Sequence, residues 1–275
     1  MRAPRPVNTA IDARRIRKWV GEYGGYRHAV TNITIESWLD QFRENDRDLA
    51  ARILDAVDFY GQDRIAAGFR RALSSIPGWN RDRRRLRGRW RFAAFSQSAG
   101  ESGDSMLHQF RLANGMDGRA YRDMFIHTSD LVRQELRAKD TVVMVDDMTA
   151  TGDQVCRAWR EFFAELVAGA GRVFLLVVVA GRAARDRIAE ETELSLVPVQ
   201  QMENRDGFFS NECVHFPAAE KDKILEYSRT ADPTHPRGYG DCAYLLVFQH
   251  RCPNNSLPIL HRSHAAWEGI FPRHD

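Results

Sequence analysis

Two adjacent acids followed by a short turn of small residues form the segment of this sequence best suited to chemistry. The apolar run 141–145 leads into Asp146 and Asp147, and the chain continues as Met-Thr-Ala-Thr-Gly-Asp-Gln over positions 148–154. We expect a strand before the acids and a helix from about Asp153. A turn between a strand and a helix points several backbone N–H groups at one spot, and the helix adds the positive end of its dipole. The segment therefore predicts a phosphate site, with the hydroxyls of Thr149 and Thr151 as further donors.

The two acids suit a ligand that carries neighbouring hydroxyl groups. Carboxylate oxygens can accept hydrogen bonds from a pair of sugar hydroxyls, or hold them through Mg²⁺ and its waters. An isolated Asp-Asp pair at a strand end is more simply explained as two solvated acids, with a Thr capping the next helix. Because strand, acid pair, turn and helix occur together here, we interpret Asp146 and Asp147 as ligands of a sugar phosphate.

The string 142–152, Val-Val-Met-Val-Asp-Asp-Met-Thr-Ala-Thr-Gly, resembles the phosphoribosyl-pyrophosphate (PRPP) binding motif of type I phosphoribosyltransferases. The resemblance implies an α/β fold, with a Rossmann-like, mainly parallel sheet flanked by helices, and PRPP with Mg²⁺ as ligands. It implies that Asp146 and Asp147 hold the ribose hydroxyls, act as the catalytic residues and bind Mg²⁺, directly or through water. The residues implied to bind the ribose or the 5′-phosphate are Asp146, Asp147, Met148, Thr149, Ala150, Thr151, Gly152, Asp153 and Gln154.

The C-terminal part is similar to the end of PRTase-like proteins found in bacterial conflict systems. The similarity covers Leu245–Leu260, then Trp267 and the Phe-Pro-Arg string at 271–273. Such proteins are commonly encoded beside anti-phage defence genes. The resemblance therefore implies an antiviral role and a protein partner from a defence operon.

Three positions depart from the PRPP motif. Ala150 stands where purine-salvage relatives carry an Asp that helps to move a proton of the base, so the purine-salvage mechanism is not expected. Asp153 replaces a small or basic residue, and its carboxylate would repel a phosphate unless it points away or caps the helix. Gln154 replaces the Ser or Thr that usually completes the phosphate site.

A transferase of this type also needs a pyrophosphate loop, and the Ser/Gly-rich stretch 98–105 is our candidate. Glycine lets the backbone approach a diphosphate closely, and serine offers a hydroxyl. The stretch can equally be a surface connection, and His-Thr-Ser at 127–129 is an alternative. The residues assigned to this loop are Gly100, Ser102, Gly103, Ser105 and Arg111.

Asn254 and Asn255 follow a predicted strand, where ligands bind in open α/β sheets. They are candidates for the acceptor side of the site, although an Asx turn would explain them equally well.

Arginine dominates the stretch 81–91, with seven Arg in eleven residues. Together with Leu86 and Trp90, which could stack on bases, this run could bind RNA or DNA. A solvated linker is the simpler interpretation, because the formal net charge of the whole chain is only +3.

The periodicity of apolar residues changes along the chain. Spacings of three and four predict helices over the first 75 residues, whereas strand and helix patterns alternate later, as in an α/β domain. We therefore expect a helical N-terminal region over 1–87 and a phosphoribosyltransferase-like α/β domain over 88–275. The predicted strands are 92–95, 124–127, 141–145, 173–179, 194–199 and 243–248, and the predicted helices of the second part are 153–168, 182–191 and 218–228.

The composition is that of an ordinary globular protein, with 275 residues, 43% hydrophobic and 28% charged. No apolar run approaches the ~18 residues of a membrane span. The N-terminus has no secretory pattern, and the four cysteines are widely spaced, so we expect a cytoplasmic protein without a membrane partner.

Three hypotheses follow. The leading one is an enzyme that binds PRPP·Mg and transfers its phosphoribosyl group to an unidentified acceptor. The second is a non-catalytic module that senses PRPP or a nucleotide and signals to a protein partner. The third is a nucleic-acid-directed effector that uses Arg81–Arg91. A homodimer remains open in each case.

Overall fold

A parallel sheet of four strands carries the acid pair. Its members are β2 (Trp90–Ala94), β3 (Thr141–Thr149), β4 (Arg172–Gly181) and β5 (Ser195–Met202), in that order across the sheet. The apolar run 173–180 of β4 is buried throughout. Such a continuous run suits a strand that is covered on both faces.

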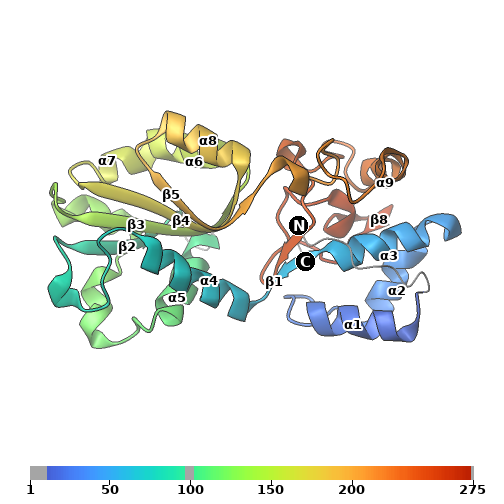
Figure 1. Ribbon diagram of the computed structural model, residues 1–275, viewed down its shortest axis with the longest axis horizontal. Coiled ribbons are helices and arrows are strands. Elements are labelled where there is room, and N and C mark those ends of the chain that lie inside the picture. The colour runs from blue at the N-terminus through green and yellow to red at the C-terminus, as the bar shows by residue number, and fades with distance from the viewer. Residues whose placement is uncertain (1–10, 97–101, 274–275) are drawn as a thin grey trace. The chain divides into compact units, whose positions relative to one another are not determined.

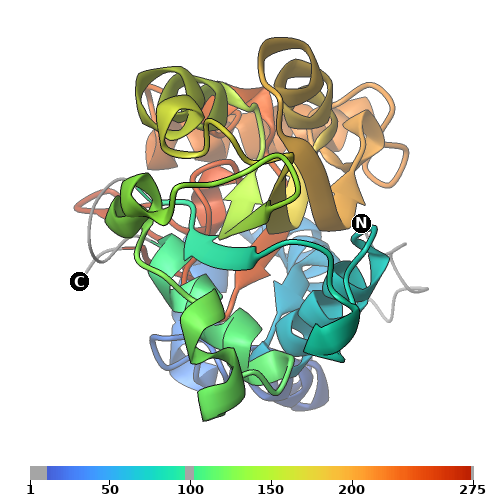
Figure 2. The same ribbon diagram turned by 90° about the vertical axis from the view of Figure 1, so that its left-hand side faces the viewer.

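Helices cover both faces of this sheet (Figures 1 and 2). On one face, α6, η5 and α7 form an unbroken helical run after β3, and with α8 they bury apolar side chains against the strands. On the other face, Phe110 of α5 contacts Phe69 of α4 and Phe92 of β2. The bounds are α4 (Gln62–Ser75), η2 (Arg83–Arg85), α5 (Ser102–Ala113), η3 (Arg119–Met124), η4 (Thr128–Gln134), α6 (Asp153–Ala158), the π-helical η5 (Trp159–Phe163), α7 (Ala164–Leu166) and α8 (Arg182–Glu191). The α/β fold with a mainly parallel sheet flanked by helices, expected from the sequence, is confirmed.

The computed structural model describes residues 11–96 and 102–273, which fold as two compact units. Unit 1 comprises Met1–Gln62 and Glu203–Asp275, and unit 2, which contains the four-stranded sheet, comprises Asp63–Met202. No helix in the described ranges combines the length and the apolar character needed to cross a membrane.

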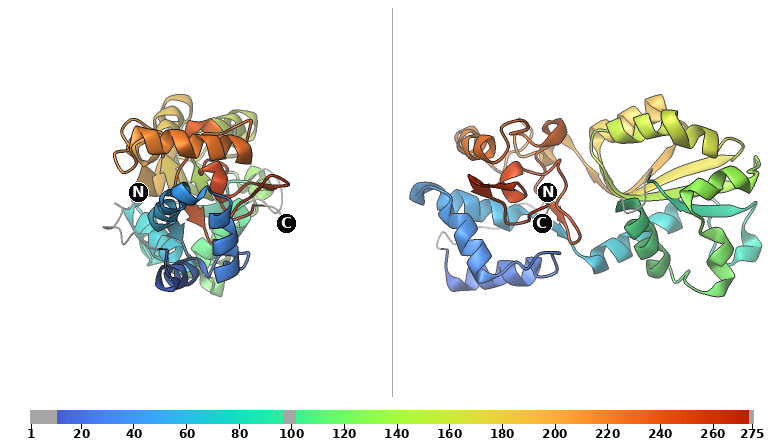
Figure 3. Two further views of the ribbon diagram at one scale, coloured as in Figure 1. Left: turned by 90° about the vertical axis from the view of Figure 1, so that its right-hand side faces the viewer. Right: turned by 180° about the vertical axis from the view of Figure 1, so that it is seen from behind.

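Unit 1 joins distant parts of the chain around its own core (Figure 3). Its short strands β1 (Asp58–Tyr60) and β6 (Leu246–Phe248) are parallel partners. Trp38 is buried and donates its indole N–H to the carbonyl of Ile259, 2.9 Å away. The other elements are α1 (Ala13–Tyr23), α2 (Asn32–Asp40), η1 (Glu44–Asp46), α3 (Arg47–Ala56), η6 (Asn204–Asp206), α9 (Ala218–Ala231), η7 (Tyr239–Asp241), η8 (Pro258–Leu260), β7 (Ser263–His264) and β8 (Trp267–Glu268).

The two units follow a different division of the chain from the one expected at residues 87 and 88. Helix α4 and the arginine run belong to unit 2, and the chain returns to unit 1 at Glu203. β6, expected to be the last strand of the main sheet, pairs with β1 instead. The predicted strand 124–127 makes only an isolated bridge between Phe92 and Phe125. Short strands carry too few residues for a pattern to identify their partner.

Hydrogen bonds to the carboxylate of Asp140 connect the start of β3 with the start of β2. Its carboxylate is 1% exposed and accepts hydrogen bonds from the backbone N–H of Arg89 (2.7 Å), from Nε of Arg89 (3.0 Å) and from the backbone N–H of Arg137 (3.0 Å). Burial alone would raise the pKa of Asp140, but these hydrogen bonds and the guanidinium charge outweigh burial and lower the pKa below its ordinary value.

We predict that Asp140→Ala lowers the free energy of unfolding by about 2–3 kcal/mol at neutral pH, because it leaves the donors of Arg89 and Arg137 without an acceptor. A lowered pKa means that this stabilisation is complete above the unfolded-state pKa of about 4 and is lost as pH falls through the folded-state pKa. Urea unfolding at pH 7 and in acid measures both effects. The exposed control Asp117→Ala should change the stability by less than about 0.5 kcal/mol. A difference between wild type and Asp140→Ala that does not shrink in acid would contradict the prediction.

Candidate functional site

The acid pair lies inside strand β3, where β3 extends past its neighbour β2. The sequence predicted that the strand ends at Val145, but it continues to Thr149. Asp146 pairs in register with Val177 of β4, whereas the pairing with β2 stops at Ala94 and Val145. Strand pairing on the β4 side holds the extra residues extended. On the β2 side, the edge of β3 at Asp146 is open to other groups.

Ser102, the first residue of α5, reaches this edge. Its Oγ lies 2.8 Å from Oδ1 of Asp146 and 3.2 Å from Oδ1 of Asp147, so its single proton can be donated to either carboxylate. The backbone N–H of Asp147 also donates to Oδ1 of Asp146, at 2.8 Å. The structure thus joins one residue of the expected pyrophosphate stretch to the expected ribose-binding pair.

The acid pair is poor in positive charge. Burial and the neighbouring charge of Asp147 raise the pKa of Asp146 well above its usual range, and the donors on Ser102 and Asp147 offset this only in part. Two carboxylates this close cannot both ionise freely unless a proton, a cation or strong hydrogen-bond donors lie between them. The site therefore favours a ligand that brings hydroxyl donors or positive charge.

The turn after β3 presents unused backbone donors. Among the hydrogen bonds of the described residues, none uses the backbone N–H of Ala150, Thr151 or Gly152. The helical run 153–166 begins directly after them, so the positive end of its dipole lies at the turn. This is the arrangement from which proteins build phosphate sites.

Gly152 is required by the shape of this turn. Its φ of 81° lies in the left-handed region, and a Cβ at this position would come within 3.2 Å of Cα of Ala184 in α8. Only glycine combines this backbone angle with so close an approach.

Asp153 is neutralised by an arginine that sequence reasoning did not identify. Arg187 of α8 donates to Oδ1 of Asp153 and also pairs with Glu191 at 2.7 Å. The other carboxylate oxygen of Asp153 accepts the hydroxyl of Thr151, at 2.8 Å. The expected repulsion between Asp153 and a phosphate is therefore reduced. The spacing between positions 153 and 187 gives no sequence signal for this pair, because it depends on how α8 packs against the turn.

The remaining positions of the motif differ in how far they are buried. Met148 is half-buried, Thr149 and Ala150 are buried, and Gln154 is exposed. The small side chain at position 150 lets the turn pack closely. It offers no acid or base.

The expected pyrophosphate loop is a helix over its described part. Ser102, Gly103 and Ser105 form the first turn of α5, and Gly100 lies outside the described residues. Gly103 has a packing role, because a Cβ there would approach the carbonyl oxygen of Phe95 to 3.0 Å. Arg111 is nine residues further along α5, about 13 Å from Ser102 along the helix axis.

Arg111 is also engaged elsewhere. It donates to the carbonyl oxygens of Met116 and Asp117 and lies 4.9 Å above the ring of Phe125. The alternative segment 127–129 meets the end of β2, where the hydroxyl of Thr128 donates to the carbonyl of Ala94 at 2.7 Å.

Asn254 and Asn255 belong to unit 1, where they hold the local chain together. The carbonyl of Asn254 accepts the N–H of Tyr239 at 2.9 Å, and the side-chain amide of Asn255 donates to the carbonyl of Tyr239 at 2.8 Å. Both asparagines therefore have a structural role in that unit.

Much of the arginine run is occupied by internal contacts. Arg89 pairs with Asp140, Arg83 pairs with Asp123 at 2.7 Å, and Trp90 is buried. The proposed stacking of Trp90 on a base is wrong, because Trp90 packs against Trp79 in the interior of unit 2.

The donor set of the acid pair fits a hard cation such as Mg²⁺. Two carboxylates and a hydroxyl supply the oxygen ligands that Mg²⁺ prefers, and Mg²⁺ commonly completes its shell with water and substrate phosphate. Within the described ranges, no three His, Cys, Asp or Glu side chains gather into a cage that could hold a metal alone. Asp146 and Asp147 are therefore the groups that would hold Mg²⁺ together with a phosphorylated ligand.

Comparisons with known proteins give one extensive match. A model of the PRTase-CE family matches residues 35–273, and a search of curated proteins finds no match. Among solved structures, a hypothetical protein from Neisseria gonorrhoeae with bound ppGpp is 12% identical, with a TM-score of 0.35, over 54% of this chain and 85% of its own. The AQ2163 protein from Aquifex aeolicus is 15% identical, with a TM-score of 0.34, over 62% of this chain and 83% of its own. Neither structure is similar enough to bear on the site.

We predict that Gly152→Ala lowers the free energy of unfolding by about 1–3 kcal/mol, because alanine must adopt a left-handed φ and crowd Ala184. Chemical unfolding followed by fluorescence measures the change. Gly118→Ala is the matched control, since its φ is −68° and a Cβ there meets no atom within 4 Å. Equal stability of the two variants would show that the turn tolerates a side chain.

Proposed function

The chain belongs to the PRTase-CE family, and on that premise we propose that it binds PRPP together with Mg²⁺ and transfers the phosphoribosyl group to an acceptor. The observation that supports this most directly is the acid pair of β3 followed by a turn whose backbone N–H groups at positions 150–152 donate to no other described residue. Each half matches one part of a ribose 5-phosphate, because the acids suit two hydroxyls and the turn suits a phosphate.

Binding would draw on two kinds of contact. The N–H groups of the turn and the dipole of the helical run 153–166 would hold the 5′-phosphate. Asp146 and Asp147 would accept hydrogen bonds from the ribose 2′- and 3′-hydroxyls, which would reduce the repulsion between the two carboxylates. Fixing the sugar at both ends orients its C1 carbon toward the acceptor.

The transfer itself requires little from the protein except position and charge. The acceptor would attack C1 of the ribose while the bond from C1 to the diphosphate oxygen breaks, and pyrophosphate would leave with the bonding electrons. Mg²⁺, when bound with the diphosphate, would supply positive charge to the leaving group. The nearby carboxylates would favour the positive charge that develops on the ribose ring.

The alanine at position 150 restricts the kinds of acceptor that fit the proposed reaction. An acceptor that needs a base supplied by this turn is disfavoured, because alanine offers none. An acceptor whose nucleophile is already deprotonated, or which carries its own base, fits the site better.

We predict that the double variant Asp146→Asn, Asp147→Asn loses PRPP affinity by about 100-fold or more, since two charge-assisted hydrogen bonds are removed. Isothermal titration calorimetry with PRPP and Mg²⁺ measures the affinity. The matched control Asp186→Asn removes an exposed acid of α8 in the same unit and should leave the affinity unchanged. Wild-type affinity in the double variant would remove the ribose-binding role.

Pyrophosphate release separates an enzyme from a sensor. PRPP is incubated with candidate bases, nucleosides or RNA, and the released pyrophosphate is measured. Release that depends on one acceptor and disappears in the double variant supports transfer. Saturable PRPP binding without release under any acceptor would favour the sensing module instead.

We further predict that Arg187→Gln weakens PRPP binding by about tenfold, because the uncompensated carboxylate of Asp153 then faces the phosphate. Adding Asp153→Asn to this variant should restore most of the affinity, since it removes the repulsive charge. The four titrations form a double-mutant cycle. If Arg187→Gln lowered the PRPP affinity equally with and without Asp153→Asn, Arg187 would not act by compensating the charge of Asp153.

A further inference from the structure

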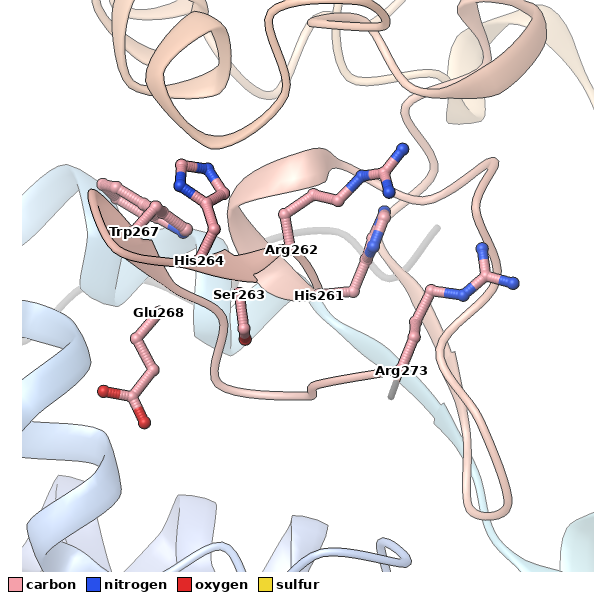
Figure 4. A pocket seen from close by; sticks show the side chains of 7 residues that line it. All are labelled: His261, Arg262, Ser263, His264, Trp267, Glu268 and Arg273. Atoms are coloured by element: carbon pink, nitrogen blue, oxygen red, sulfur yellow. The ribbon is translucent and has the colours of Figure 1, made fainter. Parts of the chain in front are cut away.

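A cavity lined mainly by basic side chains lies in unit 1, within the C-terminal segment of the chain (Figure 4). Its volume is about 430 Å³, which lies in the range of cavities that hold small metabolites. The described residues that line it are His261, Arg262, Ser263, His264, Trp267, Glu268 and Arg273. All of them belong to one unit, so the cavity is complete within that unit.

His261 is the unusual member of this set. It is 2% exposed, and within the described part of the chain only the backbone of Ser256 lies close enough to interact with its ring nitrogens, without a well-formed hydrogen bond. Burial, then the charges of Arg273 and Arg262, lower the pKa of His261 to about 3, and the nearby backbone of Ser256 opposes this only in part. A buried imidazole whose ring nitrogens lack well-formed hydrogen bonds costs free energy, which a polar ligand in the cavity would offset.

Arginine charge accumulates around this imidazole. Nε atoms of both Arg273 and Arg251 are buried without a hydrogen-bond partner. Burial, then repulsion from Arg251 and also from Arg262, lowers the pKa of Arg273. Arg262 is compensated by Asp232, to which its Nε donates at 2.7 Å. The cluster thus carries more positive charge than this single acid balances.

The cavity view shows how these groups are arranged. The guanidinium of Arg262 and the imidazole of His261 lie next to each other, with the guanidinium of Arg273 beyond them, while Glu268 points to the opposite side (Figure 4). The charges of Arg273 and Arg262 lower the pKa of His261, and the charge of Arg262 contributes to the lowered pKa of Arg273, in agreement with this proximity.

Two other polar members of the wall are engaged in internal hydrogen bonds. The indole N–H of Trp267 donates to the carbonyl of Ile259 at 3.1 Å, and Nε2 of His264 lies 3.0 Å from the carbonyl of Ala231. Trp267 therefore contributes an apolar wall. Among the described residues of the wall, this leaves His261 and Arg273 with unused hydrogen-bonding capacity, together with the carboxylate of Glu268, which points to the opposite side (Figure 4).

We propose that this cavity binds the phosphate group of a small phosphorylated molecule through His261, Arg262 and Arg273. Two guanidinium groups match the geometry and the double negative charge of a phosphate. The neutral imidazole can accept a hydrogen bond from the hydroxyl of a monoanionic phosphate through one ring nitrogen or donate its N–H to a dianionic phosphate, so it serves either form. The volume exceeds what a free ion needs, and the wall of Trp267 leaves room for an organic part of the ligand. This site is separate from the acid pair of β3 and does not depend on the function proposed for it.

The test observes His261 itself. Nitrogen NMR of the full-length protein, labelled at histidine, follows the ring signals, and His261→Gln assigns the signal of this residue. Inorganic phosphate, ribose 5-phosphate, acetate and chloride are titrated at equal ionic strength. We expect a saturable shift of the His261 signal with the two phosphates and none with acetate or chloride. Tighter binding of ribose 5-phosphate would identify an esterified phosphate as the ligand, and tighter binding of inorganic phosphate would identify the free ion.

Arg273→Gln should weaken the phosphate-dependent shift by about tenfold, because it removes an ionic hydrogen bond. The matched control Arg229→Gln removes an exposed arginine of α9 in the same unit and should leave the shift unchanged. A wild-type His261 signal that ignores phosphate, or that responds equally to chloride or acetate, would overturn the proposal. So would undiminished affinity in folded Arg273→Gln. The wild-type titration decides even if Arg273→Gln does not fold, and the loss of PRPP binding in the Asp146, Asp147 double variant leaves this result untouched.

Discussion

The main electrostatic constraint in unit 2 is the repulsion between two carboxyl groups that lie together at the edge of β3. Strand pairing with β4 fixes the backbone at Asp146, and Ser102 supplies one hydroxyl between the two acids. The raised pKa of Asp146 expresses the remaining imbalance. A fold held in this state is stabilised by any ligand that brings donors or a cation to the pair. The unused amides of the adjoining turn set the other requirement, because they select a ligand that also carries an anion.

The acid pair of β3 and the cavity of unit 1 carry opposite excesses of charge. The edge of β3 has acids without enough positive charge, and the cavity of unit 1 has arginines and an unsatisfied imidazole with too little negative charge. In both places a buried group has a pKa that departs strongly from its ordinary value for the same physical reason, which is burial reinforced by like charge. By contrast, Asp140 is buried with its full set of donors, and its pKa moves in the stabilising direction. The comparison distinguishes a buried acid whose hydrogen bonds outweigh its burial from buried groups whose burial is reinforced by like charge.

Parts of the site could be predicted from sequence because they are contiguous. The acid pair, the turn and the start of the following helix all lie within positions 146–154, and each has a local signal in residue type and spacing. The serine-rich stretch was expected to be a pyrophosphate loop, whereas its described part is a helix whose first residue, Ser102, contacts the acids. The end of β3 was placed too early, because a pattern of apolar residues stops at the first acid although hydrogen bonding to β4 continues.

The sequence by itself determined the α/β fold class, the acid pair and the glycine turn, because strand pairing, helix starts and left-handed turns depend on neighbouring residues. Only the tertiary structure decided which distant side chains complete them. Arg187 reaches Asp153 because α8 packs on the turn, and His261 is buried near two arginines because the C-terminal segment folds into the core of unit 1. The pairing of β1 with β6 was decided in the same way. Burial and long-range contact are properties of the packed chain, so no local pattern can encode them.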